Sequence, residues 1–147
     1  MKSENQVVLE FPSRSSNEAF ARVAAAGFAM QLDPTLEELG DIKTAVSEAV
    51  TNAIVHGYPE NFGRIVMKLR MLENQTMELV IRDWGCGMED VEQARQPLFT
   101  TGGQERSGMG FTIMESFMDA VKVRSTPGKG TVVTLRRRVS RRMGAPV

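Results

Sequence analysis

The sequence has almost none of the features that mark secreted, disulfide-bonded or membrane proteins. Cysteine occurs once, at Cys86, so the chain cannot form an internal disulfide and a reducing cytoplasm is expected. No uncharged apolar run approaches the ~18 residues that a membrane helix requires. Residues 1–5 carry neither an apolar stretch nor a small-residue cleavage site, so no secretory signal is expected. We therefore expect a cytoplasmic protein without a membrane partner.

Net charge is also absent, but this balance conceals an asymmetry. All 18 acidic residues precede position 121, together with only 10 of the 18 lysines and arginines, whereas residues 121–147 carry 8 basic residues and no acidic one. Such a basic end can bind nucleic acid, but no aromatic residue stands among its arginines for base stacking. We expect no direct contact with nucleic acid, and a solvated strand end followed by a flexible basic tail over residues 137–147.

What is present suffices for one domain with a hydrophobic core. The 147 residues are 41% apolar and 24% charged, which is a globular composition in a chain too short for two ordinary domains. Alternation of apolar residues predicts strands, and apolar spacings of three and four predict helices. The predicted strands are residues 6–11, 65–71, 77–83, 121–124 and 131–136, and the predicted helices are residues 15–28, 35–57 and 109–120.

The order of these elements predicts an α+β fold. Residues 84–108 are rich in glycine and polar residues and form a predicted long loop, with one helical turn near Val91. A loop of this length inside a compact domain is usually a functional lid. The order strand-helix-helix-strand-strand-lid-helix-strand-strand predicts a mixed, mostly antiparallel sheet with helices on one face. We expect this domain to cover residues 1–136.

The two long helices carry start signals and apolar stripes. Ser15 to Glu18 form a predicted capping box at the first helix, and the second helix begins near Thr35 and ends with Gly57 as its C-cap. The expected buried face of the first is Phe20, Val23, Ala24, Gly27 and Phe28, and that of the second is Leu36, Leu39, Ile42, Val46, Val50 and Ala53.

The second helix carries the first chemical constellation. Glu48 and Asn52 are four residues apart and project from the same helix face, beside the apolar stripe and not within it. A carboxylate and a carboxamide at this spacing can hold a hard cation through oxygen, and the carboxylate can accept a proton. Taken alone, the pair is better explained by an ordinary polar helix face.

A second constellation follows the predicted strand 77–83. Asp83 falls on the apolar side of that strand with Leu79 and Ile81, so its carboxylate points inward and requires a donor. A ligand amino group would serve as that donor, and Gly85 and Gly87 would let backbone approach a flat ring closely. Taken alone, Asp-Trp-Gly-Cys-Gly is more often a tight turn.

The third constellation opens the predicted helix 109–120. Gly108 and Gly110 expose backbone N–H groups at the positive end of the helix dipole, which is an anion site. Arg106 can add a bidentate phosphate contact. Glycines at helix starts are common, so this signal is also weak alone.

Together and in this order, the three constellations resemble the N, G1 and G2 boxes of the GHKL superfamily of ATPases and kinases. The match is closer to one family within it, the sporulation anti-sigma-F factors, which are also serine-protein kinases. It rests on residues 47–58 for the N box, 94–101 for the lid and 105–115 for the G2 box, with further matches at residues 20–23 and 31–35. The resemblance extends over nearly the whole chain up to about Leu135.

This resemblance implies a Bergerat fold and an ATP-dependent protein serine kinase that also inhibits a sigma factor. The implied partners are a sigma factor of the sigma-F type and an anti-anti-sigma factor whose serine is phosphorylated. Arg22, on the first helix opposite its apolar stripe, is the candidate for partner contact. A homodimer is expected as well, because the family dimerises and because pairing of edge strands would satisfy unpaired backbone groups. The apolar residues offered for it are Val7, Phe11, Phe20 and Phe28.

The resemblance assigns the adenine end of a bound ATP to the second constellation. Asp83 would accept a hydrogen bond from the amino group of adenine, with Thr131 as a nearby helper. Gly85 and Gly87 would shape the pocket around the ring.

The resemblance assigns the phosphates to the other two constellations. Asn52 would hold Mg²⁺, Glu48 would act as general base on the partner serine, and Arg106 would stabilise charge on the γ-phosphoryl group. The other implied nucleotide contacts are Thr101, Gly108, Met109 and Gly110.

Three alternatives stay open. The lid reads Gly102-Gly103-Gln104 where the family commonly has a longer stretch beginning Lys-Pro, which keeps open an ATP-dependent sigma-binding switch without kinase activity. Stress-response kinases of the sigma-B type are similar, and an ATP hydrolase of the gyrase or MutL type normally needs a second domain. His56 is the only histidine, which weighs against a self-phosphorylating histidine kinase.

Overall fold

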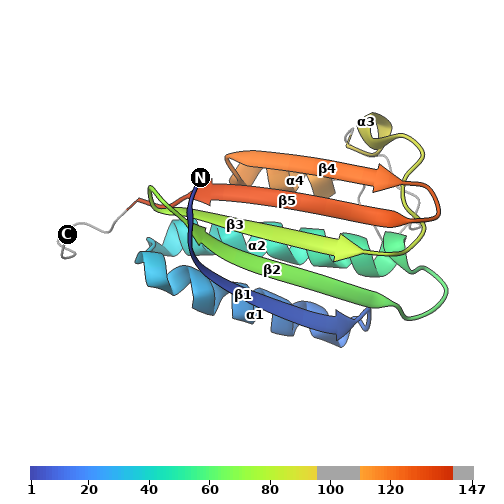
Figure 1. The fold of residues 1–147 in the computed structure, drawn as a ribbon, viewed down its shortest axis with the longest axis horizontal. Helices are drawn as coiled ribbons and strands as arrows, with labels where there is room; N and C mark the ends of the chain where they lie inside the picture. Colours follow the sequence, from blue (N-terminus) through green and yellow to red (C-terminus); the bar gives the residue numbers. More distant parts are fainter. Residues whose placement is uncertain (96–109, 141–147) are drawn as a thin grey trace.

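The computed structural model describes residues 1–95 and 110–140, which form one five-stranded sheet with helices on one face (Figure 1). The strand order is β1-β2-β3-β5-β4, and each neighbouring pair is antiparallel. The predicted α+β fold is therefore confirmed, with a sheet that is antiparallel throughout the described residues. None of the helices described is both long enough and apolar enough to cross a lipid bilayer.

The elements follow the predicted order. The strands are β1 (Ser3–Pro12), β2 (Arg64–Leu72), β3 (Thr76–Asp83), β4 (Ala120–Thr126) and β5 (Gly130–Arg138). The helices are α1 (Ser16–Ala29), α2 (Leu36–Asn52), α3 (Val91–Ala94) and α4 (Gly110–Phe117), with a 3₁₀ turn η1 (Met30–Leu32) and a π-helical turn η2 (Ala53–Gly57). α4 ends before the predicted residue 120, because the Asp119 N–H already donates to the Arg136 carbonyl of β5.

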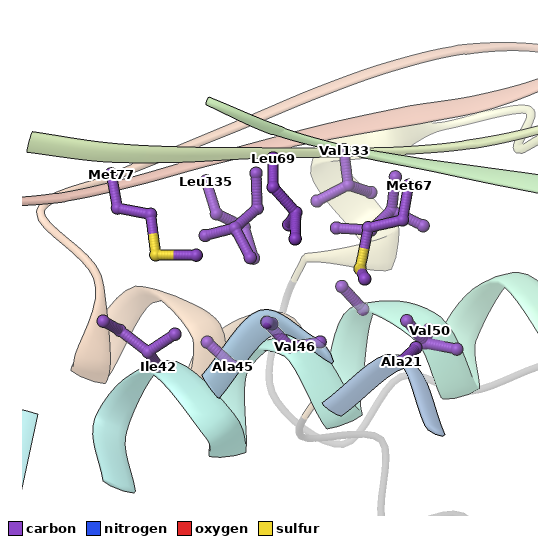
Figure 2. Packing of buried hydrophobic residues seen from close by; sticks show 14 of the residues in the cluster. Ala21, Ile42, Ala45, Val46, Val50, Met67, Leu69, Met77, Val133 and Leu135 are labelled. Atoms are coloured by element: carbon purple, nitrogen blue, oxygen red, sulfur yellow. The ribbon is translucent and has the colours of Figure 1, made fainter. Parts of the chain in front are cut away.

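The hydrophobic core lies between the sheet and α2. In Figure 2, Ile42, Ala45, Val46 and Val50 of α2 face side chains of β2, β3 and β5. Each large side chain buried in this way contributes roughly 1.5–3 kcal/mol, so α2 is held against the sheet along its length. Leu36, predicted in the same stripe, is instead 89% exposed at the first position of α2. The facing strand residues are Met67, Leu69, Met77, Val133 and Leu135.

The buried face of α1 differs from the prediction. Phe20 and Val23 are 61% and 62% exposed, whereas Phe28 of the same predicted stripe is 6% exposed and buried as expected. α1 packs against α2, and alanines allow two helices to approach more closely than phenylalanine or valine would. The residues that α1 buries are Ala21, Ala25, Phe28 and Ala29.

The predicted capping box at α1 does not form, whereas one does form at α2. Ser15 makes no side-chain capping bond, and Glu18 instead accepts a hydrogen bond from Ser47 Oγ of α2 at 2.9 Å. At the start of α2, Thr35 Oγ1 accepts from the Glu38 N–H, and the Glu38 carboxylate accepts from the Thr35 N–H. The two helices are therefore joined by a polar contact that competes with the local cap.

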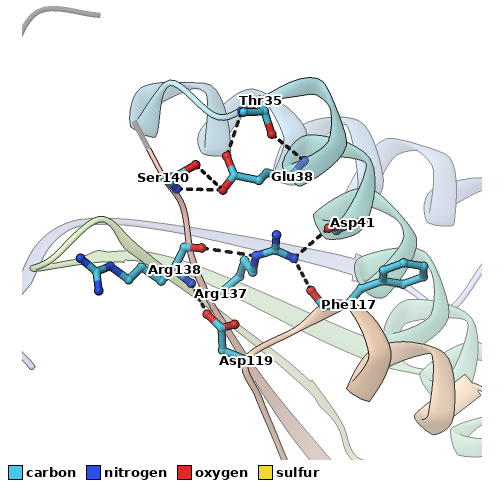
Figure 3. A network of polar contacts seen from close by, with 8 residues as sticks. All are labelled: Thr35, Glu38, Asp41, Phe117, Asp119, Arg137, Arg138 and Ser140. Carbon is cyan, nitrogen blue, oxygen red and sulfur yellow. Dashed lines mark hydrogen bonds and ion pairs between the residues drawn. The ribbon is translucent and has the colours of Figure 1, made fainter. Parts of the chain in front are cut away.

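The end of β5 packs against the start of α2 (Figure 3). Arg137 donates to Asp41 Oδ2 at 2.9 Å and to the Phe117 carbonyl, and Ser140 donates to Glu38 Oε2 through its N–H at 2.8 Å and its hydroxyl at 2.9 Å. The expectation of a solvated strand end is wrong for Arg137, whose side chain is 18% exposed because α2 supplies the Asp41 carboxylate opposite it, whereas Arg138 is exposed as expected. Residues 137–140 belong to the packed body, and residues 141–147 of the predicted tail lie outside the described residues.

Candidate functional site

Asp83 ends β3 on the face of the sheet that the helices cover. It pairs with Ile65 of β2 on one side and with Thr131 of β5 on the other, and it is 4% exposed. Its Oδ1 accepts a hydrogen bond from the Gly85 N–H at 3.0 Å. Burial raises the pKa of this carboxyl above its ordinary value, and hydrogen bonds from the N–H groups of Gly85 and Thr131 offset the burial only in part. The predicted inward orientation of Asp83 is confirmed.

The Asp83 carboxylate retains acceptor capacity. An ionised carboxylate offers about four lone-pair positions, and the backbone supplies donors from Gly85 and Thr131. A further donor would stabilise the charge that burial disfavours. The amino group of an adenine ring has this chemistry, so the residues present fit the adenine end of ATP.

The turn after β3 packs directly against the end of the long helix. The Cys86 N–H donates to the Gly57 carbonyl at 2.9 Å. A Cβ on Gly85 would lie 1.9 Å from the Gly57 oxygen, and a Cβ on Gly57 would lie 2.9 Å from Asp83 Cγ. Glycine is required at both positions because neighbouring atoms already occupy the space of a side chain.

Gly87 is required for a separate reason. Its φ is +72°, in the left-handed region that favours glycine, and a Cβ there would lie 2.1 Å from the Thr126 oxygen. Both glycines predicted to approach a flat ring therefore approach protein backbone in this structure. Their contact with a nucleotide stays a prediction.

Thr131 lies beside Asp83, as the sequence predicted. It is 5% exposed, and its hydroxyl lies 2.8 Å from Ser125 Oγ of β4. Ser125 Oγ also accepts from the Met88 N–H at 2.7 Å. This chain of contacts ties the segment after β3 to the edge of the sheet next to Asp83.

The far end of α2 carries Glu48 and Asn52, which are both half-buried. Their spacing of four places them on one face, about one helical turn apart. After Asn52 the backbone widens into η2, which contains His56 and ends at Gly57. Single π-helical turns are often found at functional sites. Because Gly57 packs on Asp83, the fold brings the first two constellations to the same end of α2.

A resident metal centre finds no support in the part of the chain that the structure describes. It contains no group of three or more His, Cys, Asp or Glu side chains placed to bind a metal ion. Mg²⁺ usually keeps several waters and takes one or two protein ligands besides substrate phosphates. The Asn52 oxygen fits Mg²⁺ that arrives with a nucleotide.

Several predicted site residues lie outside the described residues or away from Asp83. Arg22 lies on α1 with its side chain 37% exposed, and its Nη1 is 3.8 Å from Glu18 Oε2. Gly110 is the first residue of α4, which packs against α2. The predicted residues that lie outside the described ranges are Thr101, Arg106, Gly108 and Met109.

The sequence analysis includes Tyr58 in the N-box match but assigns it no role. Its hydroxyl accepts a hydrogen bond from the Trp84 N–H at 2.7 Å and donates to the Arg64 carbonyl at 2.6 Å. Its signal in the sequence is its place at the end of that match, directly after His56 and Gly57. That position does not reveal a contact with a residue 26 positions away.

Known proteins match almost the whole chain. A model of the histidine kinase-like ATPase domain matches residues 11–137. The anti-sigma F factor of Caldanaerobacter subterraneus subsp. tengcongensis is 54% identical over 143 residues, which are 96% of this chain and 99% of that protein. The anti-sigma F factor of Bacillus subtilis is 54% identical over 140 residues, which are 94% of this chain and 95% of that protein.

Solved structures share the fold at low sequence identity. The RsbU and RsbW domains of Rv1364c from Mycobacterium tuberculosis match with a TM-score of 0.69 and 19% identity, over 94% of this chain and 33% of that one. The mycobacterial sensor histidine kinase MprB matches with a TM-score of 0.57 and 17% identity, over 93% of this chain and 100% of that one. From the domain match and the two relatives above, the chain belongs to the GHKL, or histidine kinase-like, ATPase family and, within it, to the anti-sigma F factors.

Proposed function

We propose that the protein is a cytoplasmic, ATP- and Mg²⁺-dependent protein serine kinase that also binds and inhibits a sporulation sigma factor of the sigma-F type. Its substrate would be a serine of an anti-anti-sigma partner. The domain match and the names of the relatives support this reading. The observation that carries it is the buried Asp83 carboxylate, which lies against the end of the helix that bears Glu48 and Asn52.

Asp83 would recognise adenine. The amino group of the ring would donate to the carboxylate, whose pKa is raised by burial because the charged form lacks solvation. An arriving donor therefore stabilises the ionised form. Water competes little at a residue that is 4% exposed, so a single hydrogen bond there discriminates strongly between ring systems.

The end of α2 and the segment before α4 would serve the phosphates. ATP with Mg²⁺ supplies the transferable phosphoryl group and the cation that neutralises its charge. Asn52 would provide an oxygen ligand to Mg²⁺, and Glu48 would accept the proton of the serine hydroxyl. By resemblance, Arg106 stabilises the charge on the γ-phosphoryl group. The remaining donors in this proposal are Thr101, Gly108, Met109 and Gly110.

The exposed apolar stripe of α1 supports a homodimer, and Arg22, on the opposite side of the same helix, is the proposed partner contact. Phe20 and Val23 are more than half exposed, and burial of this stripe at a two-fold interface would remove it from water. Phe11 and Phe28, predicted for the same interface, are 7% and 6% exposed and belong to the core instead. Light scattering at micromolar concentration should give twice the chain mass of 16.3 kDa, and a single-chain mass would contradict the dimer.

One assay separates the proposed kinase from its alternatives. Purified protein is incubated with Mg²⁺, γ-labelled ATP and a panel of anti-anti-sigma proteins. Label on a partner serine supports the kinase, and release of free phosphate alone would indicate an ATP hydrolase. Binding of ATP and a sigma factor without label or phosphate release would indicate a non-enzymatic switch. The identity of the sigma factor that co-purifies with the protein distinguishes the sigma-F type from the sigma-B type.

A further inference from the structure

Tyr58 joins parts of the candidate site that are distant in the sequence. Its hydroxyl donates to the carbonyl of Arg64, the first residue of β2, and accepts from the N–H of Trp84, the residue directly after Asp83. Tyr58 itself directly follows η2, the turn that connects it to Asn52. One phenol group therefore links the end of the α2 helix to β2 and to the residue that directly follows β3, the strand that carries the adenine-reading carboxylate.

Trp84 is also held through its side chain. The guanidinium groups of Arg64 and Arg82 lie 4.4 and 4.7 Å from the centre of the Trp84 ring, a distance at which cations are attracted to aromatic rings. With its N–H held by Tyr58 and its ring held by two arginines, Trp84 cannot rotate without loss of several contacts. The residues on either side of it, Asp83 and the first glycine of the turn, are fixed by the same contacts.

The phenol is fixed in place by packing and stays protonated. A Cβ on Gly63 would lie 2.1 Å from Tyr58 Cε1, so the ring fills the space over that turn. Burial raises the pKa of the Tyr58 hydroxyl above its ordinary value of 10.0, the Trp84 N–H lowers it in part, and the nearby charge of Asp83 raises it further. The hydroxyl is therefore neutral at physiological pH and can both donate to Arg64 and accept from Trp84.

We propose that Tyr58 is a positioning residue for nucleotide recognition, because it holds the turn after Asp83 in register with the end of α2. The inference rests on the proposed function of this site. Tyr58 acts through the backbone of Trp84 and does not itself contact the nucleotide. Loss of its hydroxyl leaves a donor and an acceptor without their partner and loosens the segment that presents the Asp83 carboxylate. The loss of binding then falls on the adenine end of the nucleotide and not on the phosphates.

The test is the variant Tyr58→Phe, which keeps the packed ring and removes the hydroxyl. Calorimetric titration with Mg·ATP and with adenosine should show about 5- to 30-fold weaker binding of both, by the same factor. The matched control is Ser140→Ala, which removes a hydroxyl hydrogen bond to Glu38 at the other end of α2. Ser140→Ala should lower the midpoint of thermal unfolding about as much as Tyr58→Phe does, and it should leave the affinities for Mg·ATP and adenosine unchanged.

A second variant loosens the ring of Trp84 and leaves the core intact. Arg82→Gln, at an exposed position, removes one of the two guanidinium groups over Trp84. It should weaken the binding of both Mg·ATP and adenosine about 2- to 5-fold. Unchanged affinities in Tyr58→Phe, a loss confined to ATP, or an equal loss in Ser140→Ala would each overturn the positioning role while the proposed ATP site stands. A parent protein that binds neither ligand would overturn the proposed function and this inference with it.

Discussion

Two buried carboxylates lie at opposite ends of α2, and the protein satisfies them to different degrees. Glu38, in the first turn, accepts hydrogen bonds from the Thr35 N–H and from the N–H and hydroxyl of Ser140 (Figure 3). Asp83, against the far end, accepts from the backbone N–H groups of Gly85 and Thr131. Glu38 is 9% exposed and Asp83 is 4% exposed, so water supplies few hydrogen bonds to either carboxylate.

The pKa values of these two groups consequently move in opposite directions. Burial by itself raises both, but at Glu38 the hydrogen bonds from Ser140 and Thr35 outweigh burial and lower the pKa below its ordinary value. At Asp83 they do not, and the pKa stays raised. A carboxylate with enough donors stabilises the fold, whereas one with too few is stabilised by a ligand. α2 is thus anchored at its first turn, and its last turn bears Glu48 and Asn52 of the candidate site.

The largest expected effect lies at the functional end of α2. Glu48→Gln keeps the size and hydrogen-bonding capacity of the side chain but removes its basicity, so phosphoryl transfer to the partner serine should fall ~10²–10⁴-fold. Binding of Mg·ATP should stay within about 2-fold of the parent, because the residue does not hold the metal in this proposal. Single-turnover transfer and calorimetry measure the two quantities.

Asn52→Ala is the matched variant one helical turn on. It should weaken Mg²⁺-dependent ATP binding itself, since the lost amide oxygen is the proposed metal ligand. If transfer by Glu48→Gln were near the parental rate, Glu48 would be a positioning residue. Loss of ATP binding in Glu48→Gln with normal binding in Asn52→Ala would reverse the two roles.

Asp83→Asn should produce the next largest effect. ATP affinity should fall about 10²-fold, because an amide replaces the charged acceptor and its NH₂ group opposes the amino group of adenine. The circular dichroism spectrum should be unchanged, since the side chain keeps its size. Glu38→Gln is the control at the opposite end of the helix and should bind ATP like the parent. Parental affinity in Asp83→Asn would leave the carboxylate as a structural residue of the turn.

The two ends of α2 were not equally predictable from the sequence. The geometry of the candidate-site end could be predicted because its signals are local: Glu48 and Asn52 share a face by spacing, and Asp83 points inward by alternation. The anchored end could not, because the Glu38–Ser140 and Asp41–Arg137 contacts join residues 102 and 96 positions apart. Because no short pattern reveals those partners, the sequence alone predicts solvated arginines at the end of β5.

The errors on α1 have a related cause. Periodicity favours a face that includes Phe20 and Val23, whereas the packing of α1 on α2 buries three alanines together with Phe28. Its capping box failed because Glu18 has a distant alternative partner in Ser47. In each case a tertiary contact overrode a local preference, and the contact involves residues that no short pattern connects.

Glu38→Gln should have a moderate effect that is confined to stability. The amide offers one acceptor oxygen and presents two N–H donors to a place where Thr35 and Ser140 already donate. The free energy of unfolding should fall by about 1–3 kcal/mol near neutral pH, measured by urea unfolding, with ATP affinity unchanged. A change below ~0.5 kcal/mol would mean that this network does not anchor α2.

The smallest expected effect is the pH dependence of stability. It is the most direct test of the contrast between the two carboxylates, because the prediction concerns the sign of the slope and not its size. The pKa of Glu38 is lowered from 4.5 on folding, so between the folded and unfolded values the unfolded state binds more protons. The stability that Glu38 contributes is present above 4.5 and is lost as the pH falls through its lower folded pKa. The deficit of Glu38→Gln relative to the parent should therefore shrink on acidification through that range.

Asp83 should behave in the opposite way. Its pKa is raised from 3.8 on folding, so in its window the folded state binds more protons, and the parent loses stability as the pH rises from 3.8 through the raised folded value. Relative to Asp83→Asn, the parent should then become less stable with rising pH, where relative to Glu38→Gln it becomes more stable. Urea unfolding of the three proteins without nucleotide, at a series of pH values from about 3 to 7, gives both difference curves.

Slopes of opposite sign are expected because three hydrogen bonds outweigh burial at one end of α2 and burial outweighs hydrogen bonding at the other. Parallel curves would show that the two carboxylates titrate alike, and the deficit of donors at Asp83 would then no longer support a ligand there.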